Sequence, residues 1–489
     1  MQPAALATLF FLVAAPVLAG GAASQEQAAP AAAVPAPAPA PAPAPGPSDA
    51  PLGLRELQAL ARAADPRARI AAAQLEGARG KKMETDWVWF PSFTTQIGIG
   101  GPTTETRLAN KNDISTWSAG NFWGPNAGVQ ARGQVDAVLP LYTFGKISSG
   151  QAAAGHAVDA RAALLTQQQN GAAQDVARAY WGYQTTRDAQ KSIDELLGKL
   201  DEARKVAAKL IAEESEQATA SDLSRLELVG YEIQAQSDAA IAQQRLAEVA
   251  LKLLAGRSPD EPLAVKREEL PPPPDAPDLQ ALLKRAEAQR PELKAAKANV
   301  QARQALVSLE RAKYWPDLAL AGGYSFAWTS NADSPASPYA SNPYNFNAGY
   351  LGLGLRGSFD LPQKLARVTQ VEADLHEAQA MLVGAERLLR LDIEKALGDL
   401  ASARGRARHY ADSSAMAKKM LIKGALGIDS GLGNAGDVLI DALLYSRAEG
   451  ERLKARLDGQ LAWAALEFAV GEEIEAPARA SNLQLQSAP

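Results

Sequence analysis

Apolar and polar residues alternate with a period of two in two pairs of segments along the chain. In 351–361, leucine and phenylalanine alternate with glycine, arginine, serine and aspartate, and 129–139 alternates in the same way. Period two is typical of a β-strand with one apolar and one polar face. A soluble β-sandwich layer has the same alternation, but strands of about 9–11 residues also suit a tilted crossing of an outer membrane. The predicted strands are 92–101, 128–142, 317–329 and 347–361.

Two much longer segments follow the strand pairs and are helical in composition. Residues 146–213 and 364–423 contain no proline and are rich in alanine, leucine, glutamine, glutamate, lysine and arginine, which favour helices. At about 1.5 Å per residue, each predicts a rod of roughly 90–100 Å. The helices that follow carry apolar residues at coiled-coil spacing, such as Leu226 and Ile233, one heptad apart. We therefore expect two long helical hairpins.

Matched spacings indicate that the chain is an internal duplication. The interval from Pro66 to Pro91 equals the interval from Pro291 to Pro316. Likewise, Asp222 precedes Gly256 by the same interval as Asp437 precedes Gly471. Proline is suited to the first turn of a helix and also stops one, so each proline pair marks the same predicted helix. Two equal spacings in the same order favour duplication over chance.

The N-terminal region predicts export. Residues 4–18 form an apolar run of signal-peptide length followed by small residues, although a buried N-terminal helix has the same composition. Residues 27–47 are almost entirely alanine and proline, which predicts an extended tether. The predicted organisation is a signal peptide (1–19), an Ala/Pro-rich tether (20–51), a first repeat (52–256), a Pro-rich linker (257–277), a second repeat (278–471) and a C-terminal tail (472–489).

The amino-acid composition argues against several classes of function. The chain has no cysteine, which excludes disulfides and thiolate chemistry, and its net charge of −5 does not favour a nucleic-acid partner. After the N-terminus, no uninterrupted apolar run reaches the roughly 18 residues of a membrane-spanning helix. Six of the eight tryptophans fall in or beside the predicted strand regions, where interfacial aromatic girdles are expected.

We find no pattern that predicts catalysis. Gly352 to Gly357 fits G-x-G-x-x-G, but strand alternation runs through it and no helix opens at the third glycine, as a dinucleotide site requires. His156, His376 and His409 each stand alone in helical stretches, without a second histidine at metal-ligand spacing. No cofactor, metal site or enzymatic activity is expected.

Four membrane strands cannot close a barrel around an open lumen. An exported chain with four such strands must share a barrel with other copies or leave costly open edges. Three copies supply twelve strands, and the helices of each copy then line one shared tube. The predicted fold class is mainly α with membrane β: a long coiled-coil helical barrel and a shared 12-stranded trimeric β-barrel.

These blocks resemble the TolC-like outer-membrane efflux and secretion channel family, also called outer membrane factors. The resemblance covers about 52–475. The residues that carry it are Arg290-Pro291-Glu292-Leu293, Tyr314-Trp315-Pro316-Asp317-Leu318, Leu139-Pro140-Leu141-Tyr142-Thr143-Phe144-Gly145-Lys146, and Asp437-Val438-Leu439 with Gly471.

The resemblance implies a homotrimer in the outer membrane of a Gram-negative cell, in contact with outer-membrane lipid and extending into the periplasm. It also implies docking to a periplasmic adaptor (membrane fusion) protein and an inner-membrane transporter. The chain is then a passive exit duct of a tripartite efflux pump or type I secretion system. A non-conducting, periplasm-spanning scaffold is the alternative, and an adaptor, with its single hairpin, fits the duplication less well. The cargo is not identified.

The resemblance also places a gate at the hairpin tips, near 213–222 and 423–437. The family's carboxylate pair Asp-x-x-Asp has its first acid at Asp437, whereas the second position is Ile440 and Asp441 comes immediately after it. Asp222 matches an acid that the family ties to a basic residue, but that basic position is Gly433 here. A trimer would place three Asp437 carboxylates near one axis, whereas the alternative role of Asp437 is to cap its helix.

Glycines interrupt the helical pattern around the second predicted tip. The first tip, 213–222, has none. This difference predicts a second tip that bends and splays on contact with a partner, although an ordinary flexible loop has the same composition. The glycines are Gly424, Gly427, Gly431, Gly433 and Gly436.

Overall fold

The computed structural model describes residues 51–472 and residue 474, apart from 104–105, 120–127, 215–218, 338, 340–341, 343 and 430–434. The described residues belong to one structural unit, Ala50–Pro489. The predicted signal peptide, the tether before residue 51 and nearly all of the predicted tail lie outside the described residues.

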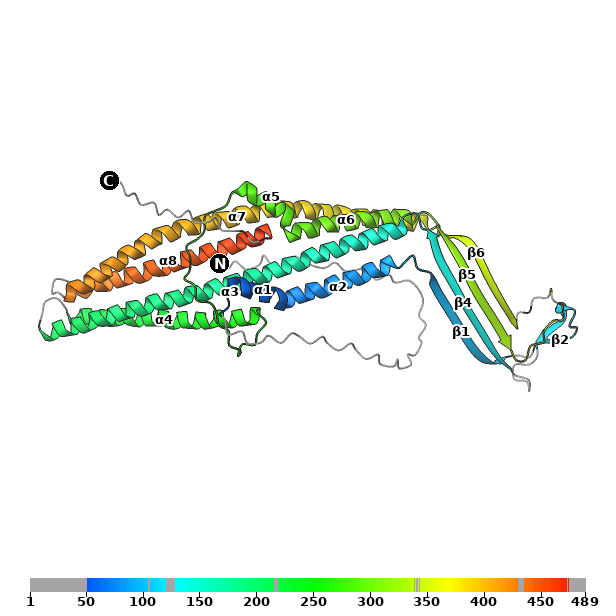
Figure 1. The fold of residues 1–489 in the computed structure, drawn as a ribbon, viewed down its shortest axis with the longest axis horizontal. Helices are drawn as coiled ribbons and strands as arrows, with labels where there is room; N and C mark the ends of the chain where they lie inside the picture. The colour runs from blue at the N-terminus through cyan, green and yellow to red at the C-terminus, as the bar shows by residue number, and fades with distance from the viewer. Residues whose placement is uncertain are drawn as a thin grey trace. The chain divides into compact units, whose positions relative to one another are not determined.

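Helices account for most of the described chain, as the predicted mainly helical class requires (Figure 1). They are α1 (Leu54–Ala64), α2 (Pro66–Asp86), α3 (Lys146–Ala212), α4 (Ala220–Leu254), α5 (Leu279–Gln289), α6 (Pro291–Ala312), α7 (Leu361–Asp429) and α8 (Ala435–Val470). The 67 residues of α3 correspond to a rod of about 100 Å. The mainly helical fold class with four long strands is confirmed.

Each short helix pair breaks at an X-Pro step. Asp65 separates α1 from α2, and Arg290 separates α5 from α6. The ring of the following proline disfavours helical geometry at the preceding residue, and both residues are extended, with ψ of 126° and 119°. The Asp65 carboxylate then accepts a 2.7 Å hydrogen bond from the Arg67 N–H, which caps α2.

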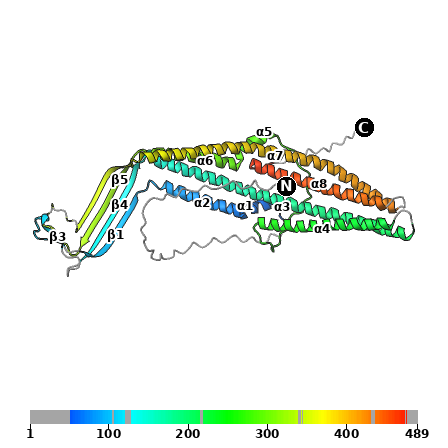
Figure 2. The same ribbon diagram turned by 180° about the vertical axis from the view of Figure 1, so that it is seen from behind.

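Four strands form one antiparallel sheet, in the order β1-β4-β5-β6 (Figure 2). A separate hairpin, which the alternation did not predict, pairs β2 with β3. The strands are β1 (Ser92–Thr103), β2 (Thr106–Leu108), β3 (Trp117–Ala119), β4 (Gly128–Tyr142), β5 (Asp317–Thr329) and β6 (Phe346–Arg356). Within the described sheet, β1 and β6 each pair with one neighbour and leave an edge.

Two predicted boundaries were wrong. The strand predicted over 347–361 ends at Arg356, because Gly357 packs against Pro316 and the chain turns into α7 at Leu361. A Cβ on Gly357 would lie 3.0 Å from the Pro316 Cβ. The second tip was predicted to begin near 423, but α7 continues through Gly424 to Asp429.

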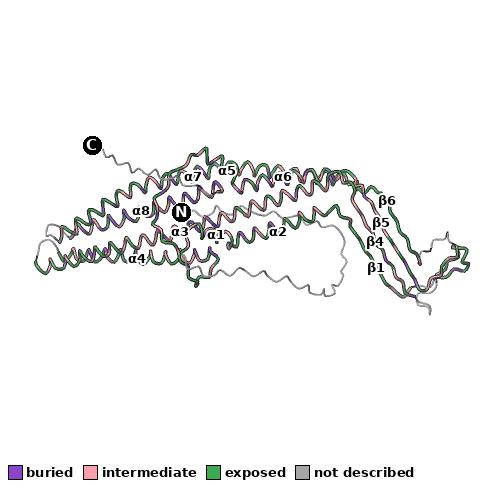
Figure 3. The backbone as a smooth tube through the Cα atoms, viewed as in Figure 1, coloured by how far each residue is buried: buried purple, intermediate pink, exposed green. Residues whose placement is uncertain are grey.

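The core is divided along the helices (Figure 3). Beside α1, Leu57 and Ala61 are buried against α3 and α4, and beside α5 the equivalent Leu282 and Ala286 are buried against α7 and α8. Nearer the tips, one cluster joins α3, α4, α7 and α8. Each repeat therefore has its own equivalent hydrophobic cluster beside its short helices, whereas one cluster near the tips contains residues of both repeats.

Candidate functional site

One face of the sheet is apolar and exposed. On β6, Leu351, Leu353 and Leu355 are 70–78% exposed, and on β1 the side chain of Ile99 is 78% exposed. The register continues this face across the sheet, because Leu353 pairs with Leu320, which pairs with Leu139. A contiguous apolar surface of this kind is suited to an apolar environment rather than to water.

The opposite face carries polar groups that bond across strands. The Tyr350 hydroxyl donates to Asp136 Oδ1 at 2.9 Å, and Gln134 Nε2 donates to Asp136 Oδ2 at 2.6 Å. Gly323 of β5 lies between Asp136 and Tyr350 in the register. A Cβ there would come within 2.5 Å of both side chains, so glycine is needed at this position.

Aromatic side chains gather where the helices meet the sheet. Trp87 and Trp89 stack at 5.9 Å between ring centroids, and Phe144 stacks on Trp315 at 5.6 Å. Trp87 and Trp315 are 58% and 60% exposed. Tryptophan favours the boundary between hydrocarbon and water, so these rings define one border of the apolar face.

A lysine at this junction ties the two repeats together. Lys146 Nζ, at the start of α3, lies 2.7 Å from Asp317 Oδ1 and donates to the Trp315 carbonyl at 2.7 Å. Its side chain is 18% exposed. The β4–α3 turn of the first repeat is therefore fixed to the α6–β5 turn of the second.

At the first tip, Asp222 caps α4. Its carboxylate accepts from the Thr219 N–H at 3.1 Å, and the Thr219 hydroxyl oxygen accepts from the Asp222 N–H at 3.2 Å, which forms a capping box. Hydrogen bonds from Thr219, together with the nearby positive charge of Arg225, hold the Asp222 pKa below its ordinary value. The partner position predicted from the family, Gly433, lies outside the described residues.

At the second tip, the two predicted acids differ in environment. Asp437 lies in the first turn of α8 and is exposed, and Ile440, one turn further along, is also exposed. Asp441 is half-buried against α7. Burial raises the pKa of Asp441, and the negative charge of Asp437 adds to the effect. Gly431 lies outside the described residues, as Gly433 does.

Close packing of α7 on α8 explains the position of Asp441. A Cβ on Gly424 would lie 3.1 Å from Val438 Cγ2 and 3.2 Å from Asp441 Oδ2. Val438 is fully buried. Gly424 therefore serves as a contact point between two helices and is not part of a flexible loop.

A buried charge lies between the hairpins, and no pattern in the sequence predicted it. Glu449 of α8 is 6% exposed and accepts hydrogen bonds from Ser414 of α7 at 2.6 Å and Ser192 of α3 at 3.2 Å. Arg452 completes the cluster with a 2.7 Å bond from its Nε. Burial alone would raise the Glu449 pKa, but the hydrogen bonds from Arg452 and Ser414 outweigh it and hold the pKa below its ordinary value. This cluster joins the two hairpins near the tips.

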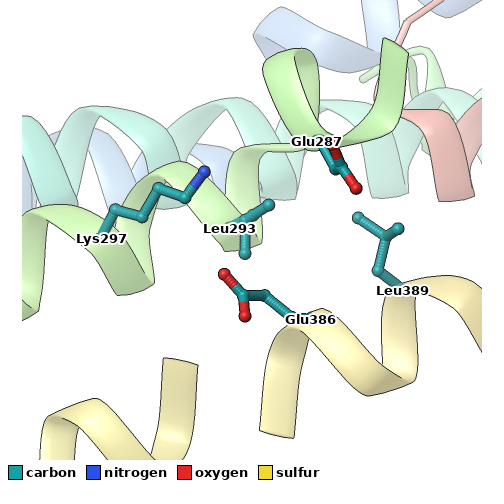
Figure 4. Close-up of a pocket in the computed structure, with 5 residues that line it drawn as sticks. All are labelled: Glu287, Leu293, Lys297, Glu386 and Leu389. Atoms are coloured by element: carbon teal, nitrogen blue, oxygen red, sulfur yellow. The ribbon is translucent and has the colours of Figure 1, made fainter. Parts of the chain in front are cut away.

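A cavity of about 350 Å³ lies between α5, α6 and α7 (Figure 4). Glu287, Leu293, Lys297, Glu386 and Leu389 line it. These side chains supply charge and apolar surface but do not include a nucleophile paired with a histidine. Elsewhere in the described chain, no group of three or more acidic or histidine side chains is arranged to hold a metal ion.

Among the described residues, no helix is both long enough and apolar enough to cross a membrane.

Comparison with known proteins identifies the class of fold. The chain is similar to the outer-membrane channel OprN at 20% identity and a TM-score of 0.70, over 86% of this chain and 90% of that one. It is similar to the outer membrane protein VceC of Vibrio cholerae at 18% identity and a TM-score of 0.67, over 86% and 97%. It is also similar to the open state of the MtrE outer membrane channel of Neisseria gonorrhoeae at 18% identity and a TM-score of 0.66, over 86% and 89%.

The fold is thus that of outer-membrane channels. Residues 282–472 match the family described as outer membrane efflux protein, and the resemblance inferred from the sequence is confirmed. No curated protein matched the chain.

Proposed function

We propose that this chain is one protomer of a trimeric outer-membrane exit duct that conducts substrates passively across the outer membrane and periplasm. The observation that carries this proposal is the four-stranded sheet with an exposed apolar face and two edges, continuous with long helices. The family match of residues 282–472 supports it independently.

Closure of the sheet supports a shared barrel. Unpaired backbone groups at the edges of β1 and β6 are costly in hydrocarbon, where water cannot replace the missing partner. Pairing β6 of one copy with β1 of the next removes both edges. Three copies give the twelve strands predicted from the sequence, with the apolar face toward lipid and the face bearing Asp136 toward the lumen.

The helical hairpins supply the periplasmic part of the duct. Their tips, which include Asp222 and Asp437, lie at the opposite end of α3 and α7 from the sheet. They are suited to meet a periplasmic adaptor and an inner-membrane transporter that provides the energy. In this proposal the protein itself is not an enzyme, and Asp437 lines the narrow end of the pore.

Mass and location test the proposal. In mild detergent, native mass spectrometry is expected to give three times the protomer mass, and cell fractionation is expected to place the protein in the outer membrane. A trimer in the outer membrane that conducts no ions in planar bilayers would favour the scaffold alternative. A monomer would contradict the shared barrel.

A further inference from the structure

The first turns of α8 have one buried face and one exposed face. Val438 and Tyr445 are 0% and 4% exposed and belong to the hydrophobic cluster near the tips. On the opposite face, Ile440 is 55% exposed and Leu444 is 47% exposed. Residues three and four apart lie on the same side of a helix, so these two apolar residues continue the face that begins with the exposed Asp437. We call Asp437, Ile440 and Leu444 the α8 stripe.

Both sides of α8 are covered within its own chain. It packs on α7 and on α3, and the cluster near the tips contains residues of all three helices. As part of the wall of a tube, α8 therefore turns the α8 stripe either to the lumen or to the outside, and not to the next helix of the wall. In the proposed duct Asp437 lines the narrow end of the pore, so Ile440 and Leu444 line it as well.

The equivalent helix of the first repeat lacks this stripe. The equal spacings pair Ile440 of α8 with Arg225 of α4. They also pair Leu444 with Val229. The Arg225 side chain is charged and 65% exposed, with its Nη1 3.7 Å from Asp222 Oδ1, and Val229 is only 5% exposed. Exposed apolar side chains at these two positions are thus specific to α8 and do not follow from the hairpin fold.

The α8 stripe places different chemistry at successive depths of the pore. At about 1.5 Å per residue along a helix, Ile440 lies about 4.5 Å beyond Asp437, and Leu444 lies about 6 Å beyond Ile440. Three copies around one axis therefore stack a ring of carboxylates, a ring of isoleucines and a ring of leucines. Carboxylates attract cations and water, whereas a narrow apolar ring offers water no hydrogen bonds and excludes it.

We propose that Ile440 and Leu444 form an apolar gate, which closes the resting pore by excluding water from it. This inference rests on the proposed function, because it requires several copies around one pore. The Asp437 ring then determines which ions are attracted to the pore, and the apolar rings determine whether an ion passes. An applied voltage promotes opening, because the electric field stabilises water dipoles within the apolar rings.

Replacing an apolar side chain by a polar one of similar size tests the gate. In planar-bilayer recordings of the full-length trimer, Ile440→Asn and Leu444→Asn are each expected to shift opening to lower voltage and to lengthen the open time. The matched control is Ile422→Asn on α7, at an isoleucine that is 42% exposed near the same tip, and no shift is expected there. Cation selectivity is expected to persist in these variants, since Asp437 is unchanged.

Thiol labelling tests which way the α8 stripe faces, because the chain contains no cysteine. A charged methanethiosulfonate reagent is added to single Ile440→Cys channels held open by voltage. Each reaction is expected to change the current in a discrete step, because the attached charge lies in the pore. The current through Ile422→Cys channels is expected to stay constant under the same treatment.

The outcomes separate the gate from the duct. A wild-type trimer that conducts, together with asparagine variants that open at the wild-type voltage, overturns the gate and leaves the duct intact. An Ile440→Cys current that the reagent does not change also overturns the gate, because the α8 stripe then faces the outside of the tube. Equal voltage shifts in Ile440→Asn and Ile422→Asn contradict it as well, since any loss of apolar surface at the tip would then suffice.

Failure of the wild-type trimer and of every variant to conduct overturns both the gate and the duct. If one asparagine variant fails to assemble, the other variant and the thiol labelling decide the question.

Discussion

The hydroxyl of Tyr350 lies 2.9 Å from Asp136 Oδ1 although a whole strand separates them. The bond crosses β5 at Gly323, the position where a side chain would block it. It links the edge strand β6 to β4 on the polar face of the sheet. The glycine is therefore a structural requirement of this bond and not a random small residue.

Replacing Gly323 by alanine is expected to break this bridge. The added methyl group would come within 2.5 Å of both Asp136 and Tyr350, which must then separate. Thermal unfolding in detergent is expected to occur at a lower temperature, and Tyr350→Phe is expected to reproduce part of the loss. The control is Gly352→Ala on the same face, where a Cβ meets nothing within 4 Å and little change is expected. Equal effects of the two alanines would contradict the steric argument.

The capping role of Asp222 predicts a dependence on pH. Its pKa in the folded protein lies below the ordinary value, so its contribution to stability is present above that value and is lost as the pH falls through the folded pKa. At neutral pH, Asp222→Ala is expected to cost about 1 kcal/mol, as for other helix caps. The free energies of unfolding of wild type and variant, measured with denaturant, are expected to begin to converge only below about pH 4 and to meet below the folded pKa. A constant difference down to low pH would assign the effect to something other than the carboxylate.

Asp441 is expected to behave in the opposite way. Burial raises its pKa, so the folded protein binds this proton more tightly than the unfolded chain, and ionisation above the folded pKa destabilises the hairpin. Asp441→Asn is therefore expected to raise the unfolding temperature at neutral pH. The gain is expected to disappear as the pH falls below about 4, where the wild-type residue is protonated in both states. A variant that is less stable at neutral pH would show that the carboxylate has a favourable partner.

Substitutions at two glycines of α7 distinguish the effect of side-chain packing on stability from the effect of helix propensity. Gly398→Ala is expected to stabilise the protein by about 1 kcal/mol, because nothing lies within 4 Å of the new methyl group and alanine favours a helix. Gly424→Ala gains the same helix propensity, but its Cβ would lie 3.1 Å from Cγ2 of the buried Val438. A net loss of stability is therefore expected. Unfolding by denaturant gives both values. Stabilisation by both alanines would mean that α7 and α8 can separate at no cost.

Much of the fold could be predicted from the sequence because it depends on local periodicity. Strand alternation located β4 and most of β6, and proline spacing located the starts of α2 and α6. The β2–β3 hairpin was not predictable, because its strands are too short to show a period. The end of β6 depends on a contact between Gly357 and Pro316, which lie on opposite sides of the β5–β6 hairpin and are distant in the sequence.

The candidate site was less accessible to sequence reasoning. Asp222 and Asp437 followed from a resemblance, and their role in a gate remains a prediction. Glu449 gave no signal, since its partners Ser192 and Ser414 come from two other helices. Its burial depends on how the two hairpins pack, which no local pattern records.

Asp437 tests the position of the gate. If three copies place this exposed carboxylate at a constriction, Asp437→Ala is expected to raise the conductance or reduce cation selectivity, because repulsion and cation attraction are both lost. Planar-bilayer recordings of both proteins give the comparison. An unchanged conductance with a lower unfolding temperature would mean that Asp437 only stabilises the N-terminus of α8 and does not line the constriction.

The central claim is that three copies of this chain enclose a conducting duct. Single-channel recording of the purified wild-type protein in a planar bilayer tests it most directly. Discrete conductance steps of uniform size are expected from the trimeric fraction. A trimer that inserts into the bilayer and gives no steps, even under applied voltage or at low pH, would contradict the account.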